Sequence, residues 1–162
     1  HIQVGDYDPN DPLLDDVWGL LEDAVVPVVI HCGSGPTPGT HTGPEPIRAL
    51  LARHPRLALV VAHMGMPEYA EFLDICAAHP NVHLDTTMAF TPFSEKLMPA
   101  PAEVLCRLPD FAERILFGSD FPNIPYGYLT AMTAITGLDG VDDDWLRAVF
   151  HDNAARLFTL SR

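Results

Sequence analysis

The chain has 162 residues, of which 48% are hydrophobic and 19% are charged. This length suits one sizeable core, so we expect a single domain over residues 1–162. The formal net charge is −13, from 22 acidic and 9 basic side chains. Such an excess of negative charge repels nucleic acid and anionic membrane surfaces, so we expect neither as a partner.

The cysteines Cys32, Cys76 and Cys106 are odd in number and far apart. This pattern favours reduced thiols over a disulfide framework and predicts a cytoplasmic protein. No signal peptide and no run long enough to span a membrane is recognisable. The chain begins at His1 without an initiator Met, inside an alternation of apolar and polar residues. We therefore expect it to be cut from a longer polypeptide.

Apolar runs and helically spaced apolar residues alternate along the chain. Five short strands are predicted, at Ile2–Gly5 and at residues 28–31, 57–62, 82–84 and 115–117. Helices are predicted at residues 13–24, from Pro44 through Leu51, from Pro67 through Cys76, and at residues 102–108 and 126–135. The tail predicts two short helices, at residues 142–150 and 154–160, the first with acidic residues at its N-terminus, where they suit the helix dipole.

Strands that alternate with helices pair in parallel, because each crossover returns the chain in the same direction. Two α/β architectures fit this order. One is an open doubly wound sheet, for which five strands are complete, and the other is a (β/α)8 barrel of which this chain would be about the last five βα units. Periodicity alone does not separate them.

Three predicted strands lead into residues that bind metals or move protons. His31 and His63 each end a strand directly, and Asp120 follows the strand at residues 115–117 after a Gly-Ser break. Because the carboxyl ends of parallel strands share one edge of the sheet, we expect these side chains to form a metal or acid–base cluster. Either imidazole taken alone fits equally well as a strand-end residue bonded to a backbone carbonyl.

Two further residues are candidate substrate ligands. His41 lies in the long loop that follows His31. Asp85 directly follows the fourth predicted strand and shares a face with His83, because strand side chains alternate with a period of two. The alternative for Asp85 is that its carboxylate only caps a turn.

Five motifs, taken in this order, resemble the C-terminal half of the amidohydrolase superfamily, and most closely its amidohydrolase-related branch. They are His31-Cys32-Gly33-Ser34-Gly35-Pro36, Ala62-His63-Met64-Gly65-Met66-Pro67, Leu84-Asp85-Thr86-Thr87, Phe117-Gly118-Ser119-Asp120-Phe121-Pro122 and Asn153-Ala154-Ala155-Arg156-Leu157-Phe158. The resemblance implies a metal-dependent TIM barrel. In it, His31 resembles the histidine ligand of strand five, His63 the histidine of strand six and Asp120 the aspartate of strand eight. The paired histidines of the family's first strand have no counterpart here.

We therefore expect a metal-dependent hydrolase in which water activated by a divalent metal attacks a small amide, ester or lactone. Zinc is the first expectation for the metal and manganese the second. His31 and Asp120 would bind the metal, His63 would polarise or protonate the substrate, and Asp120 would also act as general base.

Two alternatives remain open. A non-oxidative decarboxylase of the same family would need an arginine for the leaving carboxylate, and Arg48 and Arg53 lie on a predicted helix where solvation is expected. A protein of another class, a non-catalytic open-sheet domain that binds a small ligand, would also fit the strand order.

A barrel cut before its fourth strand has two unpaired edges, predicted here at Ile2–Gly5 and at residues 115–117. Such edges favour association. We expect a homodimer or the missing N-terminal half of the barrel as the partner.

Overall fold

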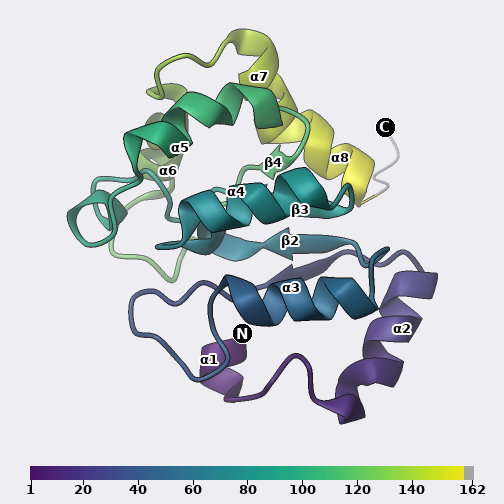
Figure 1. Ribbon diagram of the computed structural model, residues 1–162. Helices are drawn as coiled ribbons and strands as arrows, with labels where there is room; N and C mark the ends of the chain where they lie inside the picture. The colour runs from purple at the N-terminus through teal and green to yellow at the C-terminus, as the bar shows by residue number, and fades with distance from the viewer. Residues whose placement is uncertain (159–162) are drawn as a thin grey trace.

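The computed structural model describes residues 1–158 and contains a four-stranded parallel sheet with its strands in chain order (Figure 1). The strands are β1 (Val28–Ile30), β2 (Leu59–Val61), β3 (Val82–Asp85) and β4 (Ile115–Leu116). One row of the register runs through Ile30, Val61, Leu84 and Ile115, and all four side chains are buried. The predicted parallel pairing is therefore confirmed for these strands.

Every described α-helix after the first matches a predicted helix, in the same order. The α-helices are α1 (Ile2–Gly5), α2 (Asp15–Asp23), α3 (Pro44–Arg53), α4 (Tyr69–Ala78), α5 (Ala102–Arg107), α6 (Tyr128–Thr136), α7 (Asp143–Arg147) and α8 (Asn153–Leu157). In Figure 1, α3 and α4 lie across one face of the sheet, and α5 to α8 gather beyond β3 and β4. Of the predicted tail helix at residues 154–160, residues 159 and 160 lie outside the described residues.

Local chemistry explains where several helices begin. Pro44 and Pro46 occupy the first turn of α3, where a missing N–H costs nothing. The carboxylate of Asp142 accepts a hydrogen bond from the backbone N–H of Trp145 at 2.8 Å and so caps the start of α7. Asp143 and Asp144 follow in the first turn, which confirms the predicted acidic N-terminus.

The predicted strand at Ile2–Gly5 is wrong, because these residues form the single helical turn α1. The Nδ1 atom of His1 accepts a hydrogen bond from the N–H of Val4 at 3.3 Å, and Asp6 ends the turn with a left-handed φ of 46°. Two alternating apolar residues do not distinguish a strand from one helical turn, and a strand needs a neighbour to satisfy its backbone. The described sheet therefore has four strands, and its first edge is β1.

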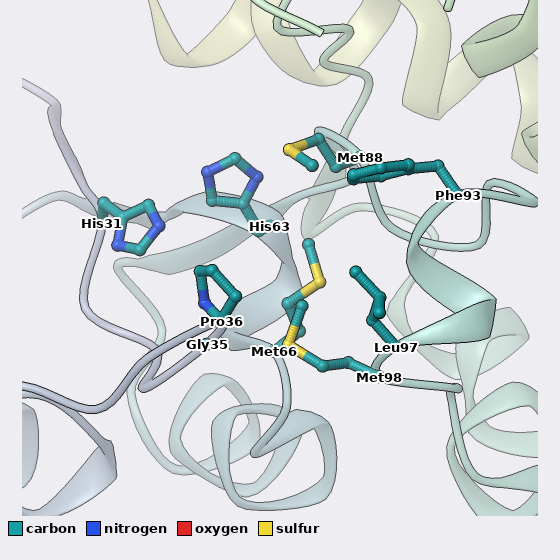
Figure 2. Close-up of a pocket in the computed structure, with 9 residues that line it drawn as sticks. All are labelled: His31, Gly35, Pro36, His63, Met66, Met88, Phe93, Leu97 and Met98. Carbon is teal, nitrogen blue, oxygen red and sulfur yellow. The ribbon is translucent and has the colours of Figure 1, made fainter. Parts of the chain in front are cut away.

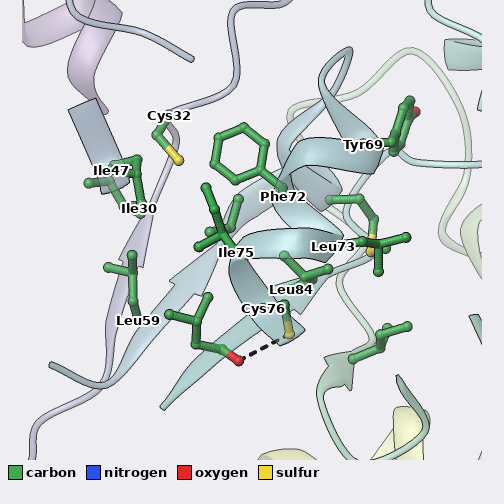
Figure 3. Packing of buried hydrophobic residues seen from close by; sticks show 14 of the residues in the cluster. Ile30, Cys32, Ile47, Leu59, Tyr69, Phe72, Leu73, Ile75, Cys76 and Leu84 are labelled. Atoms are coloured by element: carbon green, nitrogen blue, oxygen red, sulfur yellow. Dashed lines mark hydrogen bonds between the residues drawn. The ribbon is translucent and has the colours of Figure 1, made fainter. Parts of the chain in front are cut away.

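The core lies between the sheet and the helices that cross it. Phe72, Leu73 and Ile75 of α4 are fully buried against Leu59 and Leu84 of the sheet (Figure 3). Each such side chain contributes about 1.5–3 kcal/mol when it leaves water. The Cys76 thiol donates a hydrogen bond to the carbonyl of Val82 at 3.2 Å and ties the end of α4 to the start of β3.

All four strands point the same way, so their carboxyl ends share one edge of the sheet. The loops that follow β1, β2, β3 and β4 meet there. None of the helices in residues 1–158 combines the length and the apolar character that crossing a bilayer requires.

Candidate active site

His31 and His63 meet at the carboxyl edge of the sheet. They follow the neighbouring strands β1 and β2, and their ring centroids lie 4.8 Å apart at an interplanar angle of 68°. Both line a cavity of about 200 Å³ (Figure 2). The rest of its lining is Gly35, Pro36, Met66, Met88, Phe93, Leu97 and Met98. The fold thus places two imidazoles beside a small cavity with an apolar wall.

The ring of His63 is held in one tautomer. Its Nδ1 atom lies 2.9 Å from the backbone carbonyl oxygen of Thr87. A carbonyl oxygen only accepts hydrogen bonds, so Nδ1 carries the proton and donates it. In the neutral ring, Nε2 is then left with a free lone pair, which is the state that a metal ligand or a general base requires.

His31 is kept neutral by its surroundings. Burial, reinforced by the neighbouring His63, lowers the pKa of His31 from 6.5 to about 4. Its Nδ1 atom is buried and has no hydrogen-bond partner among residues 1–158. The ring of His1 stacks on it, with centroids 3.8 Å apart. A neutral imidazole with an unsatisfied buried nitrogen can bind a ligand that the chain itself does not supply.

The loop after His31 forms one side of the cavity and is fixed to α4. The carboxylate of Glu68, just before α4, accepts hydrogen bonds from the backbone N–H of Ser34, at 3.0 Å, and from the Ser34 hydroxyl. A Cβ atom at Gly33 would lie 2.4 Å from the carbonyl oxygen of Met66, so only glycine allows the two loops to approach this closely. These contacts hold Gly35 and Pro36 against the cavity.

Asp120 does not line the cavity in the described chain. It follows β4 with a left-handed φ of 56°. Burial first, and then the negative charge of Asp120, raise the pKa of Tyr126. The ring of Tyr126 lies 6.1 Å from that of Phe93, which does line the cavity. Asp120 is therefore close enough to Tyr126 to interact with it electrostatically.

The side chains present match a divalent metal in kind but do not complete a site for one. Neutral imidazoles suit zinc and related ions. Within residues 1–158, however, no group of three or more His, Cys, Asp or Glu side chains could hold a metal ion. His31 and His63 would supply two nitrogen donors, and further donors would have to come from elsewhere.

The two predicted substrate ligands, Asp85 and His41, are not among the described residues that line the cavity. The Asp85 carboxylate is nearly buried and accepts hydrogen bonds from the backbone N–H groups of His63, at 3.0 Å, and Thr87, at 2.9 Å. The Nδ1 atom of His41 lies 3.8 Å from the Asp8 carboxylate. Their assignment to substrate stays a prediction.

Sequence reasoning missed the residues of the apolar wall that follow β3. Met88, Phe93, Leu97 and Met98 come from a long connection that shows neither helical nor strand periodicity. Thr91 and Ser94 shape this segment, since both hydroxyls donate to the carbonyl of Met88 at 2.7 Å. An apolar segment directly after a strand end was the one available signal.

A parallel sheet with helices on its face and imidazoles at its carboxyl edge is the arrangement found in barrel-type α/β proteins. The family model described as "Amidohydrolase" matches residues 1–160, so the chain belongs to the amidohydrolase family. Members of this family are metal-dependent enzymes. The resemblance expected from the five motifs is thereby confirmed.

Solved structures give the same fold. An uncharacterised TIM-barrel protein of Bordetella bronchiseptica is 27% identical with a TM-score of 0.76, over 94% of this chain and 52% of its own. A 2,6-dihydroxybenzoate decarboxylase from Rhizobium is 22% identical with a TM-score of 0.67, over 94% of this chain and 57% of its own. A dihydroxybenzoic acid decarboxylase from Polaromonas, solved with manganese and 2-nitroresorcinol, is 18% identical with a TM-score of 0.64, over 95% and 56%. No curated protein matches the chain.

The chain thus spans about half the length of the barrels that it matches. The prediction of a partial TIM barrel is confirmed, with four described strands in place of the five expected.

Proposed function

We propose that this chain forms the C-terminal half of the active site of a metal-dependent hydrolase that acts on a small amide, ester or lactone. The observation that carries the proposal is the fixed tautomer of His63, which leaves Nε2 unprotonated beside the cavity. Once Nε2 has taken up a proton, His63 would polarise or protonate the substrate, and His31 would bind the metal. Asp120 would be a second ligand and the general base.

A bound divalent ion, zinc or manganese, would lower the pKa of the attacking water. The chain's own residues do the rest. His31 stays neutral and so remains able to donate a lone pair. The apolar wall formed by Met66, Phe93 and Leu97 excludes water from one side of the cavity.

Hydrolysis ranks ahead of decarboxylation because no cation of the described chain lines the cavity. Arg48 pairs with Glu45 at 3.5 Å, and Arg53 pairs with Asp15 at 2.8 Å, both from the outer helix α3. A leaving carboxylate would find no guanidinium in this half of the site.

Decarboxylation of a small aromatic acid is the second candidate. The cavity wall is almost entirely apolar, with three methionines and Phe93, and such a surface suits a flat ring. Two of the solved barrels with the same fold are decarboxylases of dihydroxybenzoic acids.

We further propose that the open edges of the sheet are covered by the other half of a barrel, or by a second copy of this chain where that half is missing. The middle residue of the edge strand β1, Val29, is 57% exposed. Leu13, Val17 and Leu20, on α2 and the turn before it, are also exposed. Exposed apolar residues beside an unpaired strand favour an interface.

A cytoplasmic location is also part of the proposal. Cys32, Cys76 and Cys106 are all free, and the first two are buried. Reduced thiols of this kind are typical of the cytosol.

The first test measures zinc and manganese binding to this chain by calorimetry, with His31→Ala, Asp120→Asn and, as control, the exposed His151→Ala. We expect weak binding that both site variants abolish and the control retains. Tight binding that survives His31→Ala and Asp120→Asn would contradict the proposed ligands.

The second test assays the polypeptide that joins this chain to a barrel's N-terminal half, loaded with either metal. The substrates are a panel of small amides, esters and lactones together with hydroxybenzoic acids. Hydrolysis lost in His63→Gln would support the first candidate. Release of carbon dioxide without hydrolysis would replace it with the second.

A further inference from the structure

The backbone at the end of β2 is strained where it presents the catalytic histidine. His63 and Met64 both adopt left-handed conformations, with φ values of 58° and 55°. Such conformations are unfavourable for residues other than glycine, and two in succession persist only when surrounding contacts hold them. The contacts that hold His63 therefore decide where its ring lies.

Residues 85–87 hold His63 through hydrogen bonds to both its backbone and its ring. The Oδ1 atom of Asp85 accepts a hydrogen bond from the backbone N–H of His63 at 3.0 Å and a second from Thr87 at 2.9 Å. The carbonyl of Thr87 in turn accepts the Nδ1 proton of the His63 ring, at 2.9 Å. One carboxylate oxygen thus links the backbone of the histidine to the residue that orients its ring.

Residues 85–87 are themselves hydrogen-bonded to the last strand, β4, and to the loop after it. Thr86 donates its N–H to the carbonyl of Leu116 at 2.9 Å, and its hydroxyl accepts from the N–H of Gly118 at 3.2 Å. A Cβ at Gly118 would lie 2.0 Å from the hydroxyl oxygen of Thr87, so the loop after β4 packs directly on this segment. Residues 85–87 are therefore fixed between β2 and β4 before any substrate arrives.

We propose that Asp85 is a positioning residue for His63. By holding both the His63 backbone and Thr87, its carboxylate keeps the proton on Nδ1, where it is donated to the Thr87 carbonyl, and leaves Nε2 unprotonated. The inference deepens the role proposed for His63 and rests on it for its catalytic meaning. Asp85 lies outside the cavity lining of the described chain, so it acts through His63 and not on the substrate.

The test reads the His63 tautomer directly, without metal or substrate. Long-range proton–nitrogen NMR spectra of the ¹⁵N-histidine-labelled chain distinguish a protonated Nδ1 from a protonated Nε2. In the wild type we expect His63 to be protonated at Nδ1. In Asp85→Ala we expect its two nitrogen signals to move toward each other, because released rings exchange between tautomers. Asp85→Asn keeps an acceptor oxygen and should restore the wild-type spectrum.

The matched control is Asp142→Ala, which removes a carboxylate that accepts the N–H of Trp145 at 2.8 Å at the start of α7 and does not line the cavity. It should leave the His63 signals unchanged. Should Asp85→Ala fail to fold, Asp85→Glu retains the charge but displaces the oxygen and should produce the same shift. A wild-type His63 tautomer in both Asp85→Ala and Asp85→Glu, or an equal shift in Asp142→Ala, would overturn the proposal. The assay does not depend on turnover, so it can fail while the hydrolase proposal stands, and the reverse.

Discussion

The central and outer strands of the sheet have similar sequences but different surroundings. In β2, Leu59, Val60 and Val61 are all at most 2% exposed, because β1 and β3 lie on either side and helices cover one face. In β1, Val29 is 57% exposed. Apolar strand residues that the described chain leaves in water mark the place where the barrel is open.

The site follows the same division. His63, from the central strand β2, is held through its ring by Thr87 and through its backbone by Asp85. His31, from the edge strand β1, has a buried Nδ1 without a partner in the described chain. Asp120, after the other edge strand, is separate from the cavity lining. The candidate site is therefore well defined at the central strand and less complete at the two edge strands.

The largest expected effect comes from making the same Val→Ala substitution in the central strand β2 and in the edge strand β1. Val61→Ala in β2 removes a side chain that is 0% exposed, and we expect it to lower the free energy of unfolding by about 2 kcal/mol. Val29→Ala in β1 should cost less than about 0.5 kcal/mol, because its side chain is already largely hydrated. Urea denaturation followed by circular dichroism measures both. Equal losses would show that the edge is covered in solution.

The dependence of stability on pH tests whether His83, on strand β3, is shielded from water in the folded chain. Burial, reinforced by Arg114 and Arg156, lowers the pKa of His83 on β3 from 6.5 to about 4. Between these values the unfolded chain binds a proton that the folded chain does not, so stability falls as the pH drops from 6.5 to about 4. Below the folded pKa this loss is complete and the contribution no longer changes.

The pKa of His31 is also lowered to about 4, so a substitution of His83 is needed to separate the contributions of the two histidines to stability. Urea midpoints of the wild type and of His83→Leu are compared from pH 7.5 to 4, a range chosen to bracket the two pKa values of about 6.5 and 4. The variant should lose less stability on acidification. Parallel curves for both proteins would mean that His83 is hydrated in solution.

How far the sequence predicts this molecule depends on which interactions are local. The strands at β1 to β4 were predictable because continuous apolar runs bounded by Gly and Pro have few alternatives. The proximity of His31 and His63 followed from parallel pairing of successive strands. Ile2–Gly5 failed because one helical turn and one short strand share the same pattern, and only the absence of a strand partner decides between them.

Other parts of the site could not be deduced from pattern. The wall residues from Met88 to Met98 come from a loop whose path is set by the Thr91 and Ser94 hydroxyls. The hydrogen bond from the His63 backbone to Asp85 depends on a left-handed backbone conformation that no sequence periodicity predicts. Sequence reasoning placed Asp85 at the strand end but could not distinguish substrate binding from a bond to the neighbouring loop.

The smallest expected change in stability concerns the edge itself. Val29→Lys places a charge at the middle of β1, where the side chain is already exposed, so the free energy of unfolding should change by less than about 0.5 kcal/mol. Association should respond far more, because a lysine on an edge strand opposes pairing with another sheet. Light scattering of the purified chain should give a dimer for the wild type and a monomer for Val29→Lys. Glu45→Gln, on the exposed face of α3, changes the net charge by the same one unit and should remain dimeric. A wild-type chain that is monomeric at micromolar concentration, or a Val29→Lys variant that still associates, would remove the β1 edge as the interface.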